Sequence, residues 1–304
     1  MRQPVLQVVG VVTQPDRPAG RGRGLTPCPC REYATTRGIN TCITPENVND
    51  PEVVEQIRSW KPDCIAVVAF GQFLKRDILE MPRFGCVNCH FSLLPKYRGA
   101  SPVTEAILNG DQLTGVSVIK MGLGMDDGPV FYRNIEPIYQ DDNGETLMDR
   151  LAIAGGVALG KTLKLMARGQ LPPPIPQVED EATFARKHKK TDGLIDWSDT
   201  AASIERRLRA FTPWPGAYTF LPARFRRKDT GRLVVVGVEF VQMQEAWRAE
   251  LPGTVLAITA RGPIVRTGDK ALLLSAVKPE GKGVMTGGAF LSGRKLEPLK
   301  DMMG

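Results

Sequence analysis

Histidine is scarce in this chain, and cysteine is confined to its first third. The 304 residues include 2 histidines and 6 cysteines, and the last cysteine is Cys89. Several cysteines lie in apolar segments, where they act as small hydrophobic residues rather than as a disulfide framework. The composition therefore favours a reducing compartment, and the cytoplasm in particular.

Long hydrophobic runs are also missing. The longest apolar segments, around Val8 and Val67, are short and interrupted by glycine or polar residues, whereas a membrane helix needs about 20 apolar residues. The amino terminus has no small-residue cleavage site, so we expect a strand there rather than a signal peptide. We therefore expect a soluble protein.

The positive charge is concentrated in the last third of the chain. Residues 201–304 contain 17 Lys and Arg against 9 Asp and Glu, whereas the preceding residues contain 23 against 24. A basic surface of this kind favours a partner with many phosphates, such as a nucleic acid, because binding releases counterions. A basic face without a partner is the alternative.

The pattern of apolar residues predicts two domains. In the first, strands at 8–13, 64–70, 86–91 and 115–121 alternate with helices, which is typical of an α/β fold with a mostly parallel sheet. Helices are expected from Asp50 to Trp60, from Ser101 to Asn109 and from Thr146 to Arg168. We place the first domain at residues 1–168 and a proline-rich linker at 169–189.

The second predicted domain, residues 190–304, has a different pattern. After a short helix at 202–211, four strands separated by glycine and proline are expected at 233–241, 253–259, 263–267 and 271–277. Strands without intervening helices pair antiparallel, and this number in so short a segment predicts a small closed barrel.

Polar residues interrupt one of the apolar strands. Asn88 and His90 are two residues apart, so their side chains project from one face of the strand, and Cys89 projects from the other. The next strand leads into a glycine-rich loop that contains Asp126 and Asp127. An amide, an imidazole and a carboxylate at one edge of a sheet can stabilise an oxyanion and remove an amine proton.

Each of these residues also has an ordinary structural explanation. A single histidine in a strand is commonly a hydrogen-bonded core residue, and Asp-Gly pairs commonly form turns. The segment Cys86–His90 matches the C-x-x-C-H pattern of covalent haem attachment, but a buried strand without an export signal does not fit haem. Zinc is not expected, because the cysteine pairs at 28, 30 and at 86, 89 are too far apart in sequence, and His188 lies elsewhere.

The chain resembles the folate-dependent formyltransferases. Residues 88–102 match the family pattern Asn-x-His followed by Ser-Leu-Leu-Pro-x-x-Arg-Gly-Ala-x-Pro, and residues 114–116 and 124–128 match as well. Residues 13–22 and 213–218 are similar to segments of the members that act on initiator tRNA. The resemblance covers nearly the whole chain.

This resemblance implies a Rossmann-like first domain that binds 10-formyltetrahydrofolate as formyl donor, and an OB-like second domain that helps to bind methionyl-initiator tRNA. Asn88, His90 and Asp126 would be catalytic. The folate would be bound by Phe70, Gly71, Ser92, Leu93, Leu94 and Pro95, and the tRNA by Arg17, Arg21 and Arg23. No metal is implied, and we expect a monomer in the bacterial cytosol or an organelle of bacterial descent.

The chain also departs from the family pattern. Family members begin with a strand, a Gly-Thr-Pro loop and a helix that have no counterpart here, so the first strand of this chain corresponds to the second of the family. Cys89, Phe91 and Asp127 stand where smaller or neutral residues are commoner. Two alternatives follow, which are a formyltransferase acting on a small-molecule amine and an inactive RNA-binding remnant.

Overall fold

A computed structural model describes residues 6–19, 24–225, 231–292 and 295–304. The chain forms two compact units. The first comprises Met1–Pro102, Thr114–Pro137 and Arg150–Ala185, and the second comprises Val103–Leu113, Ile138–Asp149 and Arg186–Gly304. The first unit thus includes most of the segment predicted as a linker, and the second takes in two short segments from the first half of the sequence.

The first unit is mixed α/β, with the Rossmann-like parallel pairing that the sequence predicts. Its main sheet has the strand order β5 (Ile65–Val67), β6 (Cys86–His90), β8 (Leu113–Lys120) and β9 (Val130–Pro137). Strands β5 and β6 are parallel, and Val67 lies opposite Asn88. The bounds of β5, β6 and β8 were each predicted to within a few residues.

The pairing of β8 differs from the prediction of a mostly parallel sheet. β8 runs antiparallel to β6, so that His90 lies opposite Ser117 and Val87 lies opposite Lys120. The chain therefore enters β8 from the edge at which β6 ends. A parallel arrangement would first require the connection to return along the length of the sheet.

The predicted first strand also pairs differently from expectation. Only Val11–Val12 (β1) forms a strand, and it pairs in parallel with β4 (Cys42–Ile43) in a separate two-stranded sheet. Gly10 allows the Trp60 ring to pack against the chain before β1, because a Cβ at Gly10 would lie 2.4 Å from that ring. Two further strand pairs in this unit are β2 (Arg17–Ala19) with β3 (Gly24–Thr26), and β7 (Arg98–Gly99) with β10 (Phe184–Ala185).

The helices predicted at 50–60, 101–109 and 146–168 are present as α2 (Pro51–Ser59), α4 (Pro102–Asn109) and α5 (Gly144–Ala167). Two further helices, α1 (Pro29–Thr36) and α3 (Arg76–Leu79), and a short 3-10 helix at Glu179–Glu181 have bounds that were not predicted. Pro51 at the first position of α2 begins that helix, as expected for a residue without an amide hydrogen. Gly110, with φ of 73°, ends α4.

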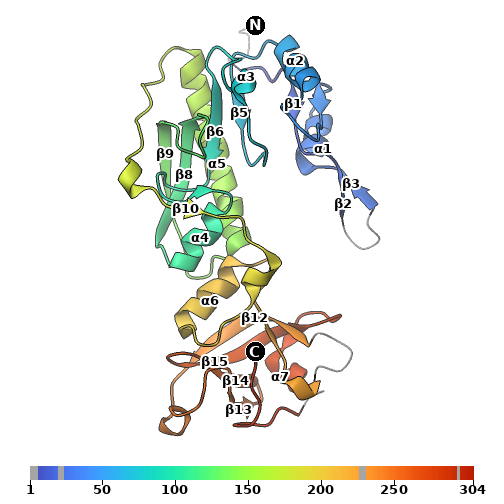
Figure 1. Ribbon diagram of the computed structural model, residues 1–304, viewed down its shortest axis with the longest axis vertical. Helices are drawn as coiled ribbons and strands as arrows, with labels where there is room; N and C mark the ends of the chain where they lie inside the picture. Colours follow the sequence, from blue (N-terminus) through green and yellow to red (C-terminus); the bar gives the residue numbers. More distant parts are fainter. Residues whose placement is uncertain (1–5, 20–23, 226–230, 293–294) are drawn as a thin grey trace. The chain divides into compact units, whose positions relative to one another are not determined.

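Helix α5 runs along the main sheet (Figure 1). It packs on the face to which Cys89 points, because a Cβ added at Gly155 of α5 would lie 2.8 Å from the Cys89 Sγ and 3.0 Å from the Phe91 ring. The alternation along β6 therefore directs Cys89 and Phe91 towards the helix. Asn88 and His90 point to the opposite face.

The second unit contains an antiparallel sheet, with the order β11 (Tyr218–Phe220), β12 (Arg232–Val241), β15 (Ala271–Pro279), β14 (Gly262–Arg266) and β13 (Val255–Thr259), and with β16 (Met285–Thr286) on β15. Residues 186–304 of this unit also form helices α6 (Ala201–Ala210) and α7 (Gly287–Leu291) and 3-10 helices at Lys190–Gly193, Ala223–Phe225 and Glu245–Trp247. Among the described residues the strand order is open, so the closed barrel is not confirmed.

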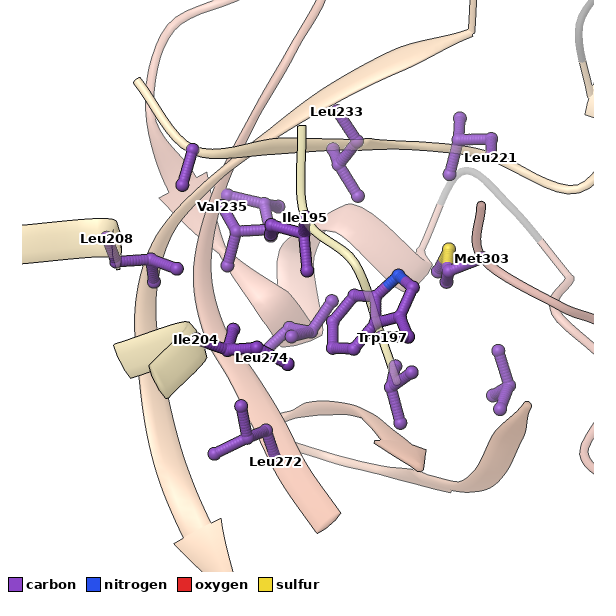
Figure 2. Packing of buried hydrophobic residues seen from close by; sticks show 14 of the residues in the cluster. Ile195, Trp197, Ile204, Leu208, Leu221, Leu233, Val235, Leu272, Leu274 and Met303 are labelled. Carbon is purple, nitrogen blue, oxygen red and sulfur yellow. The ribbon is translucent and has the colours of Figure 1, made fainter. Parts of the chain in front are cut away.

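The core of the second unit surrounds Trp197 (Figure 2). The ring lies among aliphatic side chains from α6 and from the strands of the sheet, including Ile204, Leu233 and Leu274, each of which is fully buried. The indole nitrogen donates a hydrogen bond of 3.0 Å to the Thr219 hydroxyl, so the one polar atom of the ring is satisfied inside the core. Within the described residues, no helix is long and apolar enough to cross a membrane.

Two adjacent glycines of α5 give opposite expectations for stability. Alanine at Gly156 would meet nothing within 4 Å, so Gly156→Ala should raise the free energy of unfolding by about 0.5–1 kcal/mol through helix propensity. Gly155→Ala should lower it, because the new methyl group would press on Cys89. Urea denaturation followed by circular dichroism tests the pair, and equal shifts of both midpoints would contradict the packing of α5 on β6.

Candidate active site

Strand β6 brings Asn88 and His90 to one face of the sheet. His90 is buried, with 6% of its surface exposed, and Asn88 is half-buried. Val87 and Cys89 alternate with them and are buried on the other face. The apolar residues keep the strand in the sheet, and the two polar side chains emerge next to each other.

The loop after β8 brings the Asp126 carboxylate to these two side chains. Asn88 Nδ2 donates a hydrogen bond of 3.1 Å to Asp126 Oδ1, and His90 Nδ1 lies 3.5 Å from Asp126 Oδ2. The backbone N–H of Gly99 donates a second hydrogen bond, of 2.9 Å, to Asp126 Oδ2. The structure therefore brings together all three residues predicted to be catalytic, whereas Asp127 lies against the glycines of its own loop.

Asp126 arrives by a route that the sequence did not suggest. Because β8 is antiparallel to β6, β8 ends beside Val87, at the start of β6. The glycine-rich loop then turns back to carry Asp126 to Asn88. Asp126 itself has φ of 50°, in the left-handed region that aspartate tolerates better than most residues.

The two ring nitrogens of His90 have different partners. Nε2 lies 2.8 Å from the backbone oxygen of Tyr97, which can only accept, so the proton on Nε2 is donated to that carbonyl. Nδ1 then faces Asp126, and an attractive contact requires a proton between Nδ1 and the carboxylate. Burial lowers the pKa of His90, while the charge of Asp126 and the bond to Tyr97 act against that decrease.

The arrangement suits addition of an amine to a carbonyl group. Asn88 Nδ2 carries two hydrogens, and only one is needed for its bond to Asp126. The second hydrogen can face a developing oxyanion, and the positive charge of a protonated His90 can stabilise it. The buried pair can also receive a proton from an attacking amine.

The residues predicted to bind folate divide into two kinds. Ser92 and Leu94 are buried, and Ser117 holds their backbone by donating to the Ser92 oxygen and accepting from the Leu94 N–H. Leu93 and Pro95 are half-buried. We therefore expect Leu93 and Pro95, rather than the side chains of Ser92 and Leu94, to offer contact surface to a ligand.

Phe70 and Gly71 follow the end of β5, the strand next to β6. The Phe70 carbonyl accepts a 2.6 Å hydrogen bond from the Gln14 side chain, and its ring packs against the cluster of apolar residues beneath β5. Gly71 is exposed and has φ of 79°, so the chain turns sharply there. Both lie where a ligand at the carboxyl end of parallel strands would be.

Of the three arginines predicted to bind tRNA, only Arg17 is among the described residues. Its side chain is exposed and makes a 2.7 Å ion pair with Glu46. Arg21 and Arg23 lie outside the described residues, and their assignment stays a prediction.

Three residues around the Asp126 loop were not predicted from the sequence. These are Arg98, Gln177 and Glu179, which are linked to one another and to the loop backbone by hydrogen bonds. Arg98 lies within the family pattern, but no role was predicted for it. Gln177 and Glu179 lie in the segment predicted as a linker, where no periodicity indicates a contact.

The metal and haem alternatives depend on cysteine, histidine and carboxylate side chains. In the described ranges, no group of three or more His, Cys, Asp or Glu side chains could hold a metal ion. Cys86 and Cys89 are the two cysteines of the C-x-x-C-H pattern. Both are buried, and the Cys86 thiol donates to the Ile78 carbonyl. Burial raises the pKa of Cys86 to about 12 and that of Cys89 to about 11, which makes both thiols poor nucleophiles.

An amide, a buried imidazole and a carboxylate at the edge of an α/β sheet form a site suited to acyl transfer. Comparison with known proteins identifies the family. Residues 2–163 match the formyl transferase family, and residues 187–295 match its C-terminal domain. The chain belongs to the formyl transferase family.

Its relatives are similar over almost their whole length. Methionyl-tRNA formyltransferase of Citrifermentans bemidjiense is 40% identical over 96% of this chain and 87% of its own length, and that of Myxococcus xanthus is 41% identical over 96% and 89%. Among solved structures, HypX of Aquifex aeolicus with tetrahydrofolic acid has a TM-score of 0.61 at 18% identity, covering 96% of this chain and 49% of its own. Methionyl-tRNA formyltransferase of Clostridium thermocellum has a TM-score of 0.52 at 19% identity, over 77% and 94%.

The burial of His90 predicts how stability changes with pH. Because its pKa in the folded protein is lowered from the ordinary 6.5, the unfolded chain binds the proton more tightly than the folded one. The free energy of unfolding should therefore fall as the pH drops through 6.5, and His90→Gln should remove this part of the decrease. Urea titrations of both proteins across this range test the sign. If the free energy of unfolding of the unmodified protein rises relative to that of His90→Gln as the pH falls, the prediction is wrong.

Proposed function

We propose that this chain transfers the formyl group of 10-formyltetrahydrofolate to the amino group of methionyl-initiator tRNA, giving N-formylmethionyl-tRNA for translation initiation. The convergence of Asn88, His90 and Asp126 at distances of 3.1 and 3.5 Å carries the chemistry of this proposal. The choice of substrate is supported by methionyl-tRNA formyltransferases about 40% identical over most of the chain.

In the proposed reaction the methionine amine attacks the formyl carbon. The carbonyl electrons move to oxygen, where the free Asn88 N–H and the positive charge of a protonated His90 stabilise the oxyanion. The amine then loses one proton to the His90–Asp126 pair. When the tetrahedral intermediate collapses, the carbonyl re-forms, the bond from carbon to N10 of the folate breaks, and N10 takes up the proton that the His90–Asp126 pair accepted from the amine, so that charges and atoms balance.

The folate would lie on the exposed surface formed by Phe70, Gly71, Leu93 and Pro95. Apolar side chains with a few polar backbone groups suit a flat heterocycle with a polar edge. HypX was solved with tetrahydrofolic acid, which is consistent with folate as the formyl carrier here. No metal has a part in this mechanism.

We assign the tRNA to the basic C-terminal part and to the arginines of residues 17–23. Residues 201–304 hold the excess of positive charge, and phosphate contacts from such a surface would supply most of the affinity. We propose that residues 190–304 form an OB-like tRNA-binding domain, joined by residues 169–189 to a catalytic domain of residues 1–168. The enzyme would act as a monomer where translation begins, in a bacterial cytosol or an organelle of bacterial descent.

A small-molecule amine is the alternative acceptor. A structure of an N-formyltransferase of Helicobacter canadensis with folinic acid and dTDP-3-aminofucose has a TM-score of 0.55 with this chain at 16% identity, which shows a shared fold. Formyl transfer to an amino sugar at least as fast as to charged tRNA would favour this alternative. Binding of charged tRNA without any transfer would favour an inactive RNA-binding protein.

The role of Asn88 can be tested kinetically. Asn88→Ala should lower kcat by about 10²–10³-fold, the usual cost of one oxyanion donor, and should leave the Kd for charged tRNA unchanged. Rapid-mixing assays with methionyl-tRNA and 10-formyltetrahydrofolate would measure both values. A rise in Kd that accounts for the whole loss of kcat/KM would exclude the oxyanion role.

The arginine loop should affect binding and not chemistry. Arg21→Ala should raise the KM for tRNA, leave kcat unchanged and reduce the slope of log K against log salt by about one, the effect of losing one phosphate contact. Arg168→Ala, at an exposed position after α5, is the matched control and should leave the KM, kcat and the salt slope unchanged. Equal slopes for Arg21→Ala and the unmodified protein would remove Arg21 from the tRNA site.

A further inference from the structure

The backbone of the Asp126 turn is held by a side chain that is distant in sequence. Gln177 Nε2 donates two hydrogen bonds of 2.7 Å, one to the backbone oxygen of Asp126 and one to that of Gly128. These oxygens belong to a loop whose central residue has a left-handed conformation. A single amide group therefore holds the loop at Asp126 itself and again two residues further on.

The orientation of the Gln177 amide is itself determined. Its Oε1 accepts a 3.1 Å hydrogen bond from Arg98 Nε, so Nε2 must face the loop carbonyls. Arg98 is fixed in turn by a two-pronged ion pair with Glu179, with distances of 2.7 and 2.9 Å. The Arg98 side chain is 3% exposed, and Glu179 closes the network from the surface.

The segment that contains Gln177 and Glu179 also holds the backbone on either side of Arg98. Arg98 N donates to the Thr183 carbonyl and Ala100 N to the Ala185 carbonyl, which fastens β7 to β10. Gly99 must be glycine here, because a Cβ would lie 2.5 Å from the Ala185 oxygen.

The residues on either side of Arg98 touch the catalytic side chains directly. The Tyr97 oxygen accepts from His90, and the Gly99 N–H donates to Asp126. The Tyr97 N–H is bound in turn by the Thr183 hydroxyl, at 2.9 Å. Residues 177–185, which we call the strap, therefore support both His90 and Asp126 from one side.

We propose that Gln177 is a positioning residue for the reaction, which holds Asp126 at His90 and Asn88, and that Arg98 and Glu179 fix the Gln177 amide for this purpose. The proposal deepens the function proposed above and rests on it. Gln177 touches neither the imidazole nor the carboxylate, so it acts only through the backbone of the loop. Loss of its two donors should allow the turn to relax and the carboxylate to withdraw.

The first test is a kinetic cycle. Gln177→Ala should lower kcat for formylation of charged tRNA about 100-fold, the cost of a misplacement on the order of 1 Å, and should leave the KM for tRNA unchanged. In an Asp126→Asn background the same substitution should have little further effect, because its action passes through Asp126. Gln170 is an exposed glutamine that precedes the strap. Gln170→Ala is therefore the matched control and should behave like the unmodified protein.

A second test works without turnover. The chain has only 2 histidines, so the imidazole NMR signals of His90 are identified by their loss in His90→Gln. The charge of Asp126 raises the pKa of His90 against burial, so Gln177→Ala should lower that pKa further, and Gln170→Ala should not change it. Gln177→Glu should behave as Gln177→Ala, since a carboxylate has no donor for the loop.

The outcomes separate the two proposals. If the unmodified protein does not formylate charged tRNA, the proposed function fails, and the His90 titration still decides the positioning role. If the protein is active and Gln177→Ala keeps its full kcat, the positioning role is overturned alone. An equal loss in the Asp126→Asn background, or an unchanged pKa of His90, would likewise reduce Gln177 to a residue that only stabilises the fold.

Discussion

The Asp126 carboxylate is the point on which the candidate site depends. Its Oδ1 accepts from Asn88, and its Oδ2 accepts from the backbone of Gly99 and faces the imidazole of His90. A buried imidazole without this neighbour would be a neutral ring bonded to one carbonyl. With it, two polar side chains of β6 become a donor pair that shares a movable proton, which is what addition to a carbonyl requires.

Much of this arrangement can be predicted from the sequence, because it depends on local pattern. The alternation along β6 places Asn88 and His90 on one face, and the apolar periodicity locates β12, β14 and β15 to within a residue or two. Glycine and proline mark the helix ends, as Pro51 and Gly110 do. These features follow from side-chain direction and backbone geometry over a few residues.

The remaining features depend on contacts between distant segments, and the sequence does not encode them in a local pattern. The antiparallel entry of β8 is decided by how residues 91–112 connect two strands of similar composition. The role of Gln177 depends on a contact across more than fifty positions to a loop that it does not resemble, and nothing around Gln177 but a run of prolines marks it. The second unit likewise takes up residues 103–113 and 138–149, which no change in composition separates from their neighbours.

The two faces of β6 have a practical consequence. Cys89 is 4% exposed and lies on the opposite face of β6 from the neighbouring His90 imidazole, with its sulfur against Gly155 of α5. With a pKa raised to about 11 by burial, this thiol is inert towards alkylating reagents while the helix stays in place. Once the more exposed cysteines are blocked, the rate at which Cys89 is alkylated reports how often α5 separates from β6. The protein therefore contains a natural probe of local unfolding next to the candidate site.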